Sequence, residues 1–323
     1  MQPQEGRNRV IIEGVKPEID GGRFAIKRIV GDETIVEANI LADGHDALSC
    51  ALLYRKENEL DWNEVPMDLL GNDRWRASFS VTEVGRYHYT VQGWVDHFKT
   101  WARDLGKRVQ AGQDVSVDLL IGAEMVDAAC KYAAGMQAKW LATYAEAMRT
   151  GGDEAARQAL SPDLARLMGQ YGERGYVTTY EKELEVVVDP EHARFGAWYE
   201  LFPRSCSPVP GKHGTLRDVE KHLPYVAGMG FDILYLPPIH PIGESFRKGK
   251  NNATTAAPGD PGSPWAIGGK EGGHKAVHPQ LGTLEDLRHL VKAAARYDIE
   301  LALDIAFQCS PDHPYVHEHP EWF

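Results

Sequence analysis

The strongest constraint on the fold of this chain is the alternation of short apolar segments with helical stretches between residue 195 and residue 323. Strands separated by helices run parallel, because a parallel connection needs a crossover of a dozen or more residues. Thr215 and Thr283 stand where two of the helices would begin, a position that threonine favours. The sequence therefore predicts a parallel sheet. The expected strands are 196–202, 231–236 and 300–307, and the expected helices are 216–229 and 284–297.

The pattern before residue 120 differs and is typical of β-structure. Residues 35–41 and 48–54 are short apolar runs, and residues 87–91 alternate apolar with polar side chains. The same alternation at residues 115–119 predicts one more strand. Many short strands separated by turn residues predict a β-sandwich over residues 1–120.

Residues 121–178 are predicted to form an α-helical insert, because they are rich in alanine and other strong helix formers. A stripe of large apolar residues recurs at helical spacing, and we interpret it as the core of a small bundle. Its members are Met136, Trp140, Tyr144 and Met148. Residues 179–194 are expected to hold a returning sandwich strand and a linker, so the helices would interrupt the sandwich.

Charge and composition exclude several classes of protein. The chain has 35 basic and 47 acidic residues, a net charge of −12 that argues against binding to nucleic acid. We expect no membrane span, because no stretch of 18 uncharged apolar residues occurs. Residues 1–6 lack an apolar signal core, and four widely spaced cysteines favour a reducing compartment, so we expect a cytoplasmic protein. His274, His278 and His313 follow no zinc-ligand spacing, and we expect no metal.

The loops that follow the second and third expected strands of the parallel sheet are rich in polar residues. In a (β/α)8 barrel, the loops after the strands carry the chemistry. The loop after the second strand is about 40 residues long, far longer than the usual two to six, and it includes Arg247, Lys248 and Lys250. We interpret it as a wall of a substrate site, and the alternative is a disordered surface loop. No base is placed to activate Cys309, so a buried thiol is favoured over a nucleophile.

The residues around these strand ends resemble the α-amylase clan. That clan carries an aspartate in its third barrel strand, followed four and five positions later by asparagine and histidine. Asp304 matches this aspartate, whereas Gln308 and Cys309 stand in place of the following pair. With this glutamine and cysteine, the chain resembles one subfamily of the clan, the bacterial α-1,4-glucan:maltose-1-phosphate maltosyltransferases. The segments that resemble it are 240–244, 247–249, 262–268, 271–274 and 308–314.

The resemblance implies an α+β multidomain fold, in which a β-sandwich with an α-helical insert precedes the first part of a (β/α)8 TIM barrel. Residues 195–323 would be the first three βα units of that barrel. The chain would then be an N-terminal fragment of the enzyme. The resemblance also implies a homodimer formed through the N-terminal domain and the helical insert, and no cofactor.

The reaction implied by the resemblance is transfer of maltosyl from maltose 1-phosphate to the non-reducing end of an α-1,4-glucan, with retention and release of phosphate. Its role would be α-glucan (glycogen) biosynthesis. Retention requires a nucleophile and an acid/base. The resemblance places both beyond residue 323, so we expect no catalytic residue in this chain and no activity from it alone.

The resemblance also implies a substrate-binding set. Lys248 and Gln308 would bind the maltosyl donor, and Ser263 would line the same pocket. Gln308 offers a donor and an acceptor in one plane, which suits sugar hydroxyls. Asp304 is interpreted as support for the barrel mouth and not as a catalytic acid.

Two alternatives stay open at this point. One is a hydrolase of the same clan that releases malto-oligosaccharides, and the other is a non-catalytic glucan-binding or dimerisation module. Tryptophans of the predicted sandwich could form a glucan-stacking face, although a core or interface position is favoured. These tryptophans are Trp62, Trp75, Trp94 and Trp101.

Overall fold

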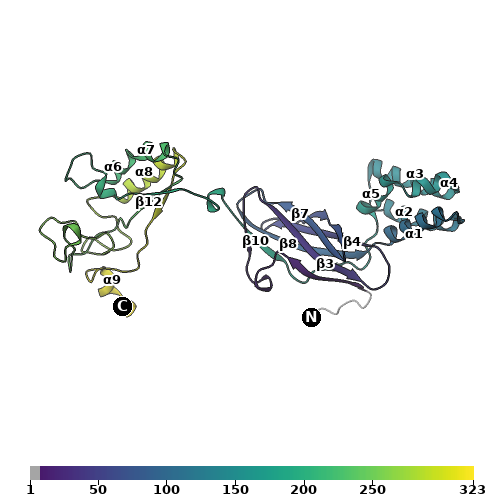
Figure 1. Ribbon diagram of the computed structural model, residues 1–323, viewed down its shortest axis with the longest axis horizontal. Coiled ribbons are helices and arrows are strands. Elements are labelled where there is room, and N and C mark those ends of the chain that lie inside the picture. Colours follow the sequence, from purple (N-terminus) through teal and green to yellow (C-terminus); the bar gives the residue numbers. More distant parts are fainter. Residues whose placement is uncertain (1–7) are drawn as a thin grey trace. The chain divides into compact units, whose positions relative to one another are not determined.

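A computed structural model describes residues 8–323 of the chain (Figure 1). Residues 1–7, including the segment without a signal core, lie outside the described residues. The chain divides into two compact units, Met1–Glu191 and His192–Phe323. Both units combine helices with sheets.

The first unit is built on two β-sheets. One sheet has the strand order β1-β3-β7-β6, and the other has the order β2-β10-β8-β4-β5 with β9 paired to β8. The strands are β1 Val10–Lys16, β2 Ile26–Ile29, β3 Glu33–Ala42, β4 Leu48–Lys56, β5 Asn63–Pro66, β6 Asp68–Gly71, β7 Arg74–Ser80, β8 Gly85–Val95, β9 Thr178–Thr179 and β10 Leu184–Asp189.

The core of the first unit lies between these sheets. Alternate residues of β3 are buried, as a half-buried strand requires, whereas most residues of β8 from Tyr87 to Val95 are buried. The rings of Tyr54 and Phe79 stack with centroids 4.5 Å apart. The indole Nε1 of Trp75 donates to the carbonyl oxygen of Ile40 at 3.1 Å, so this buried ring has its one polar atom satisfied.

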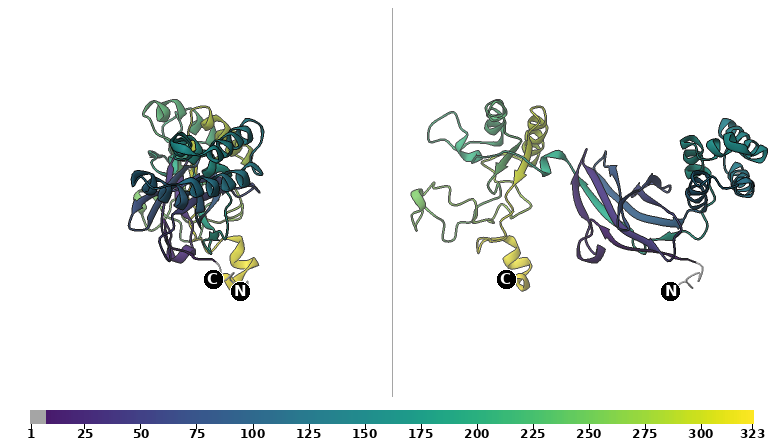
Figure 2. Two further views of the ribbon diagram at one scale, coloured as in Figure 1. Left: turned by 90° about the vertical axis from the view of Figure 1, so that its right-hand side faces the viewer. Right: turned by 45° about the vertical axis from the view of Figure 1, so that its right-hand side comes forward.

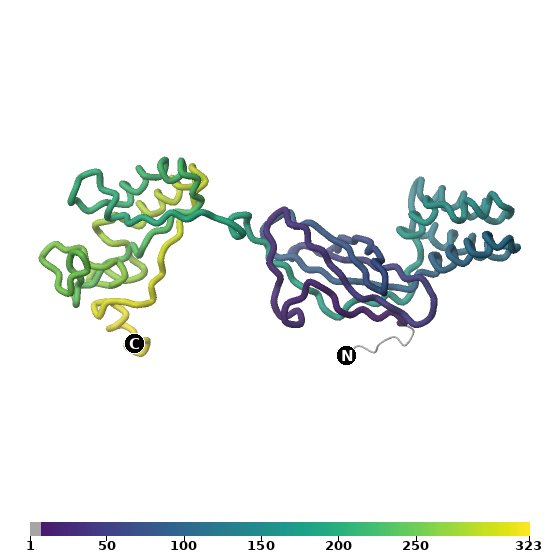
Figure 3. The backbone as a smooth tube through the Cα atoms, viewed as in Figure 1, coloured from purple at the N-terminus to yellow at the C-terminus, as the bar shows by residue number. Residues whose placement is uncertain are grey.

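Helices α1 to α5 interrupt the sandwich between β8 and β9 and gather at one end of it (Figure 2). They are α1 His97–Gln110, α2 Ser116–Cys130, α3 Gly135–Thr150, α4 Gly152–Ala159 and α5 Pro162–Tyr171. The chain then returns through β10, which pairs antiparallel with β8 and parallel with β2 (Figure 3).

The structure corrects the expected boundary between sandwich and helices. Helix α1 already begins at His97, and the strand expected at residues 115–119 is wrong because α2 covers that segment from Ser116. A segment of five positions with three apolar residues is too short to distinguish the two-residue period of a strand from the 3.6-residue period of a helix. In the helix, Leu119 is buried and Val117 is 67% exposed.

The stripe of large apolar residues on α3 is core only in part. Met148 is buried and Tyr144 packs against the core of the helices, whereas Met136 is 55% exposed and Trp140 is 45% exposed. The buried face runs through Leu141, Ala145 and Met148, which are spaced for one side of a helix.

The second unit has a three-stranded parallel sheet in the order β11-β12-β13, which confirms the predicted parallel sheet. Helices α6, α7 and α8 share one apolar core with this sheet. The elements are β11 Trp198–Glu200, α6 Leu216–Glu220, α7 Leu223–Gly228, β12 Ile233–Leu236, α8 Leu284–Ala295, β13 Glu300–Leu303 and α9 Pro314–Glu318.

Side-chain caps fix where two of these helices begin. The side chains of Thr215 and Thr283 each accept a hydrogen bond from the backbone N–H three residues later. In turn, the carboxylates of Asp218 and Asp286 accept from the backbone N–H of these threonines, which completes a capping box. The helix expected over residues 216–229 is divided in two, because a proline enters the first turn of α7.

Short single-turn helices complete the description of residues 8–323. They are η1 Asp20–Gly22, η2 Glu191–Ala193, η3 Pro203–Ser205, η4 Lys250–Asn252 and η5 Pro320–Trp322. None of the helices in this part of the chain has the length and apolar character that a membrane crossing requires.

Candidate functional site

The candidate site is formed by the loops that leave β12 and β13. These strands are parallel neighbours, with Tyr235 opposite Ala302, so both loops emerge at one edge of the sheet. Asp304 lies just past the end of β13 and accepts a hydrogen bond of 2.8 Å from Nε1 of Trp265 in the β12 loop. A hydrogen bond with Asp304 also raises the pKa of Tyr235. Asp304 therefore joins the two strand ends to the long loop.

A second connection between the loops is made by Asp312. Its Oδ2 accepts hydrogen bonds from the backbone N–H groups of Glu244 at 2.7 Å and Ser245 at 2.6 Å. Its Oδ1 accepts from the Ser245 hydroxyl at 2.6 Å. These bonds, led by the one from the Ser245 hydroxyl, lower the pKa of Asp312. The carboxylate is thus held ionised against the start of the β12 loop.

The backbones of the two loops also pack closely. A Cβ on Gly243 would lie 1.9 Å from the Ser310 hydroxyl oxygen, so only glycine fits at this position. The Ser310 N–H donates to the carbonyl oxygen of Ile267 at 2.7 Å. The loops therefore approach to a distance at which no side chain fits between them.

A chain of two histidines completes the connection. The Tyr315 N–H donates to His313 Nδ1 at 3.0 Å, so that nitrogen carries no proton. His313 Nε2 therefore donates to His274 Nδ1 at 3.0 Å, and His274 Nε2 donates to the Ala306 carbonyl oxygen at 2.7 Å. All four ring nitrogens therefore have a hydrogen-bond partner. Burial lowers the pKa of His313, which favours its neutral form.

Arg247 is committed to the loop itself. Its Nε donates to the Gly243 carbonyl oxygen at 2.9 Å, and its Nη2 donates to the Ile242 carbonyl oxygen at 2.8 Å. Beside it, the backbone of Phe246 has φ of 55°, a left-handed conformation that is unfavourable for a bulky residue. The loop is hydrogen-bonded and tightly turned, so the alternative of a disordered loop finds no support in this part of the chain.

The sequence-predicted substrate residues lie on these loops. Lys248 and Gln308 are both exposed, and Ser263 is half-buried. Lys248 follows Ser245 by three residues and Gln308 precedes Ser310 by two, so Asp312 brings their backbone segments together. Within residues 8–323, neither the Lys248 nor the Gln308 side chain makes a hydrogen bond or ion pair, and they make none with each other. Both side chains are available to a ligand.

Cys309 lies next to Gln308 and is half-buried. Burial raises the pKa of its thiol, which disfavours the thiolate needed for nucleophilic attack. The part of the chain described by the structure contains no group of three or more His, Cys, Asp or Glu side chains placed to hold a metal ion.

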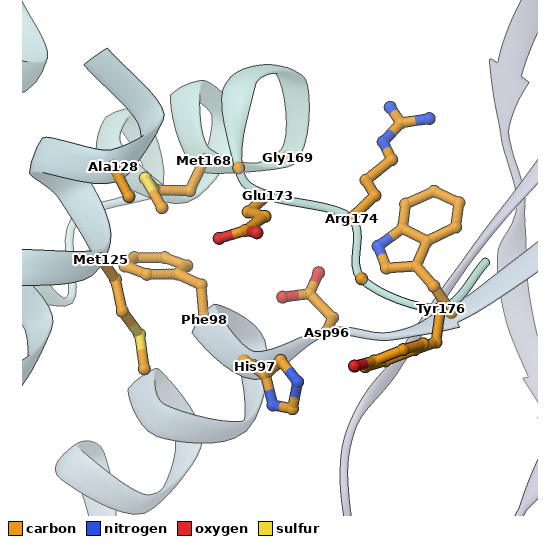
Figure 4. Close-up of a pocket in the computed structure, with 13 residues that line it drawn as sticks. Asp96, His97, Phe98, Met125, Ala128, Met168, Gly169, Glu173, Arg174 and Tyr176 are labelled. Carbon is orange, nitrogen blue, oxygen red and sulfur yellow. The ribbon is translucent and has the colours of Figure 1, made fainter. Parts of the chain in front are cut away.

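A separate cavity of about 370 Å³ lies in the first unit, where the sandwich meets the helices (Figure 4). Phe98 and Met168 form an apolar wall, and the carboxylates of Asp96 and Glu173 point into the space. Asp96 already accepts hydrogen bonds from the Ser49 hydroxyl at 2.7 Å and from a helix N–H. None of the sequence-predicted substrate residues lines this cavity.

The tryptophans that the sequence placed in the sandwich do not form an open sugar platform. Trp75, Trp94 and Trp101 are buried, which confirms the interpretation of these three as core residues. One face of the Trp94 ring is covered by Arg174, whose guanidinium lies 4.4 Å from the ring centroid. Trp62 is half-buried, and the guanidinium of Arg55 lies 4.5 Å from its ring centroid.

Sequence reasoning missed the connecting role of Asp312. The Ser310-Pro311-Asp312 segment was noted only as part of a resemblance, and its turn-forming composition is the one local signal. The bonds from Asp312 to Glu244 and Ser245 span 67 residues or more, so no local pattern predicts them.

Comparison with known proteins finds similar sequences over the whole chain. A family model described as "Alpha-1,4-glucan:maltose-1-phosphate maltosyltransferase, domain N/S" matches residues 8–190. A curated protein named α-1,4-glucan:maltose-1-phosphate maltosyltransferase from Chlorobaculum tepidum is 54% identical over 100% of this chain and 48% of its own length. A protein of the same name from Myxococcus xanthus is 50% identical over 97% of this chain and 49% of its own.

The chain spans about half the length of the curated relatives it matches. Among solved structures, an α-amylase from Lactobacillus plantarum is 36% identical, with a TM-score of 0.32. That alignment covers 40% of this chain and 26% of the amylase.

Proposed function

We propose a function from one premise: this chain belongs to the family of α-1,4-glucan:maltose-1-phosphate maltosyltransferases. The protein transfers maltosyl from maltose 1-phosphate to the non-reducing end of an α-1,4-glucan and releases phosphate. Configuration at the anomeric carbon is retained, and the reaction serves α-glucan biosynthesis of the glycogen type in the cytoplasm.

The observation that carries this proposal is the ordered loop cluster after β12 and β13, within a chain 54% identical to a maltosyltransferase. Arg247, Lys248 and Lys250 place three cationic side chains in four positions of a protein whose net charge is −12. A phosphorylated sugar is attracted to such a segment, whereas the acidic remainder repels it.

Within this site, Lys248, Gln308 and Ser263 bind the donor. Lys248 supplies a charge and three N–H donors, and Gln308 supplies a planar amide that both donates and accepts. Asp304 supports the site without contacting the reacting atoms, because its carboxylate accepts from Trp265 and bonds with Tyr235.

Retention requires two carboxyl groups about 5–5.5 Å apart, one as nucleophile and one as acid and then base. We place both on barrel strands that follow residue 323 in the longer enzyme, as in the family, so this chain alone is catalytically inactive. Leu303, Ile305 and Phe307 support the same placement, because they form an exposed apolar stripe that further barrel units would cover.

The protein's partners are the maltose 1-phosphate donor, the glucan acceptor and a second copy of the chain. The homodimer forms through the N-terminal domain and the helical insert, and the exposed Met136 and Trp140 on α3 support this surface as a contact. Light scattering with size-exclusion chromatography on the full-length protein tests it. A monomer at micromolar concentration would reject the dimer.

Two other functions stay as alternatives. A hydrolase of the amylase clan would release malto-oligosaccharides from glucans, and a non-catalytic module would only bind glucan or mediate dimerisation. The exposed, unpartnered Lys248 favours a phosphorylated donor over both alternatives.

The deciding experiment incubates the full-length protein with maltose 1-phosphate and a malto-oligosaccharide acceptor. Release of phosphate together with chain growth by two glucose units supports the transferase. New reducing ends without phosphate release support the hydrolase. Glucan binding without any turnover supports the module.

A further inference from the structure

We infer that Asp312 is a positioning residue for the donor site, which fixes the segment carrying Lys248 against the segment carrying Gln308. The inference rests on the proposed function, because it concerns how that donor site is held. Asp312 need not touch the substrate. It acts through two consecutive backbone N–H groups and one hydroxyl, all of which donate to its carboxylate.

The carboxylate itself is held at a fixed point. The Ser310 hydroxyl accepts from the Asp312 N–H at 3.2 Å and bonds with its Oδ2 at 3.2 Å. Ser310 is 3% exposed and is packed against the backbone of Gly243. Its N–H is bonded to Ile267. The Ser310 side chain that holds Asp312 is therefore itself buried and hydrogen-bonded, which fixes the position of the carboxylate.

The segment carrying Lys248 has two anchors on either side of one turn. The first is the bond of Ser245 to Asp312, and the second is the binding of the Arg247 guanidinium to loop carbonyls. Between them, Phe246 adopts its left-handed turn with φ of 55°. If the Asp312 anchor is lost, no bond from the loop after β13 holds Glu244 and Ser245, and Lys248 is free to move relative to Gln308.

The charge and shape of Asp312 predict a graded series of variants. D312A removes every acceptor for the N–H groups of Glu244 and Ser245. D312N keeps the shape, since its oxygen accepts the two N–H groups while its NH₂ donates to the Ser245 hydroxyl. Bonds to a neutral acceptor are weaker than bonds to a carboxylate. D312N is therefore expected to rescue most of the geometry that D312A loses.

Asp286 provides a matched control in the same unit. Its carboxylate also accepts from one backbone N–H and one hydroxyl, both of Thr283, and from Arg217. It caps α8 through Thr283, and none of its bonds reaches residues 244–248 or 308–312. D286A therefore costs comparable hydrogen bonds without releasing the segment that carries Lys248.

The test measures steady-state kinetics of the full-length protein and hydrogen exchange of residues 244–248 in wild type, D312A, D312N and D286A. A misplaced binding group costs on the order of 100-fold, so D312A should raise the KM for maltose 1-phosphate by about 10- to 100-fold, with a smaller change in kcat. D312N should fall in between, and D286A should match the wild type. Exchange at 244–248 should accelerate in D312A alone.

A wild-type donor KM in D312A would overturn the inference, and so would an equal rise in D286A, which would indicate general destabilisation. If the wild-type protein does not use maltose 1-phosphate, the proposed function fails. The exchange comparison then decides whether Asp312 orders the segment: unchanged exchange in D312A rejects that role, and accelerated exchange confined to D312A supports it.

Discussion

At the residue scale, the site loops depend on positions where no side chain fits. The Cβ that an alanine would add at Gly243 would lie 1.9 Å from the Ser310 hydroxyl oxygen and 2.8 Å from the Gly268 carbonyl oxygen. The second of these atoms is backbone and cannot rotate away. The size of the side chain at position 243 therefore determines whether the loops after β12 and β13 can pack against each other.

Gly243→Ala is predicted to destabilise the second unit by about 1 to 3 kcal/mol, the usual cost of overpacking. The measurement is unfolding in urea, with hydrogen exchange of peptides from residues 192–323 as the probe of the second unit. Gly228→Ala is the control, because a Cβ at the end of α7 meets nothing within 4 Å. Equal stability of the two variants would contradict the close packing.

Burial of His313 makes the connection between the loops sensitive to acid. Burial, followed by the neighbouring His274, lowers the pKa of His313, so the folded protein binds fewer protons than the unfolded chain. Stability from this group is complete above the ordinary histidine value of about 6.5 and is lost as the pH falls below it. The melting temperature should therefore fall between pH 7 and pH 5.

His313→Gln should flatten that pH dependence, whereas His317→Gln on the exposed side of α9 should leave it unchanged. Thermal melts of both variants across this range are the measurement. An identical pH profile in His313→Gln and the wild type would show that the histidine chain does not contribute.

At the scale of elements, the caps were the most predictable feature of the sequence. Thr215 and Thr283 were expected to begin helices, and both form capping boxes. Local composition determines such a bond, because donor and acceptor lie three residues apart. The strand expected at residues 115–119 was wrong, and the predicted core stripe on α3 was right only at Tyr144 and Met148. Which face of a segment is buried depends on partners far away in sequence.

Thr283→Ala is predicted to cost about 1 kcal/mol, the typical value for loss of an N-cap hydroxyl. Thr283→Ser keeps the hydroxyl and should restore most of the stability. Chemical denaturation of both variants provides the comparison. The capping account fails if serine is no better than alanine at this position.

At the scale of the whole molecule, the sequence predicted a sandwich, a helical interruption and a parallel sheet, since each has its own period of apolar residues. It could not predict how the site loops close. Asp312 to Ser245 and His313 to His274 are connections between segments 67 and 39 residues apart. Only the fold that brings β12 beside β13 creates them.

The central claim is that these loops bind a maltosyl phosphate donor. Substitution of Lys248 tests this claim most directly. The most direct measurement is the KM for maltose 1-phosphate of the full-length protein in Lys248→Ala and Lys250→Ala. Both lysines are exposed and lie two residues apart. We predict a rise of about 10-fold or more for Lys248→Ala, the cost of one lost charged hydrogen bond, and little change for Lys250→Ala. Equal KM values for the two variants and the wild type would contradict the account.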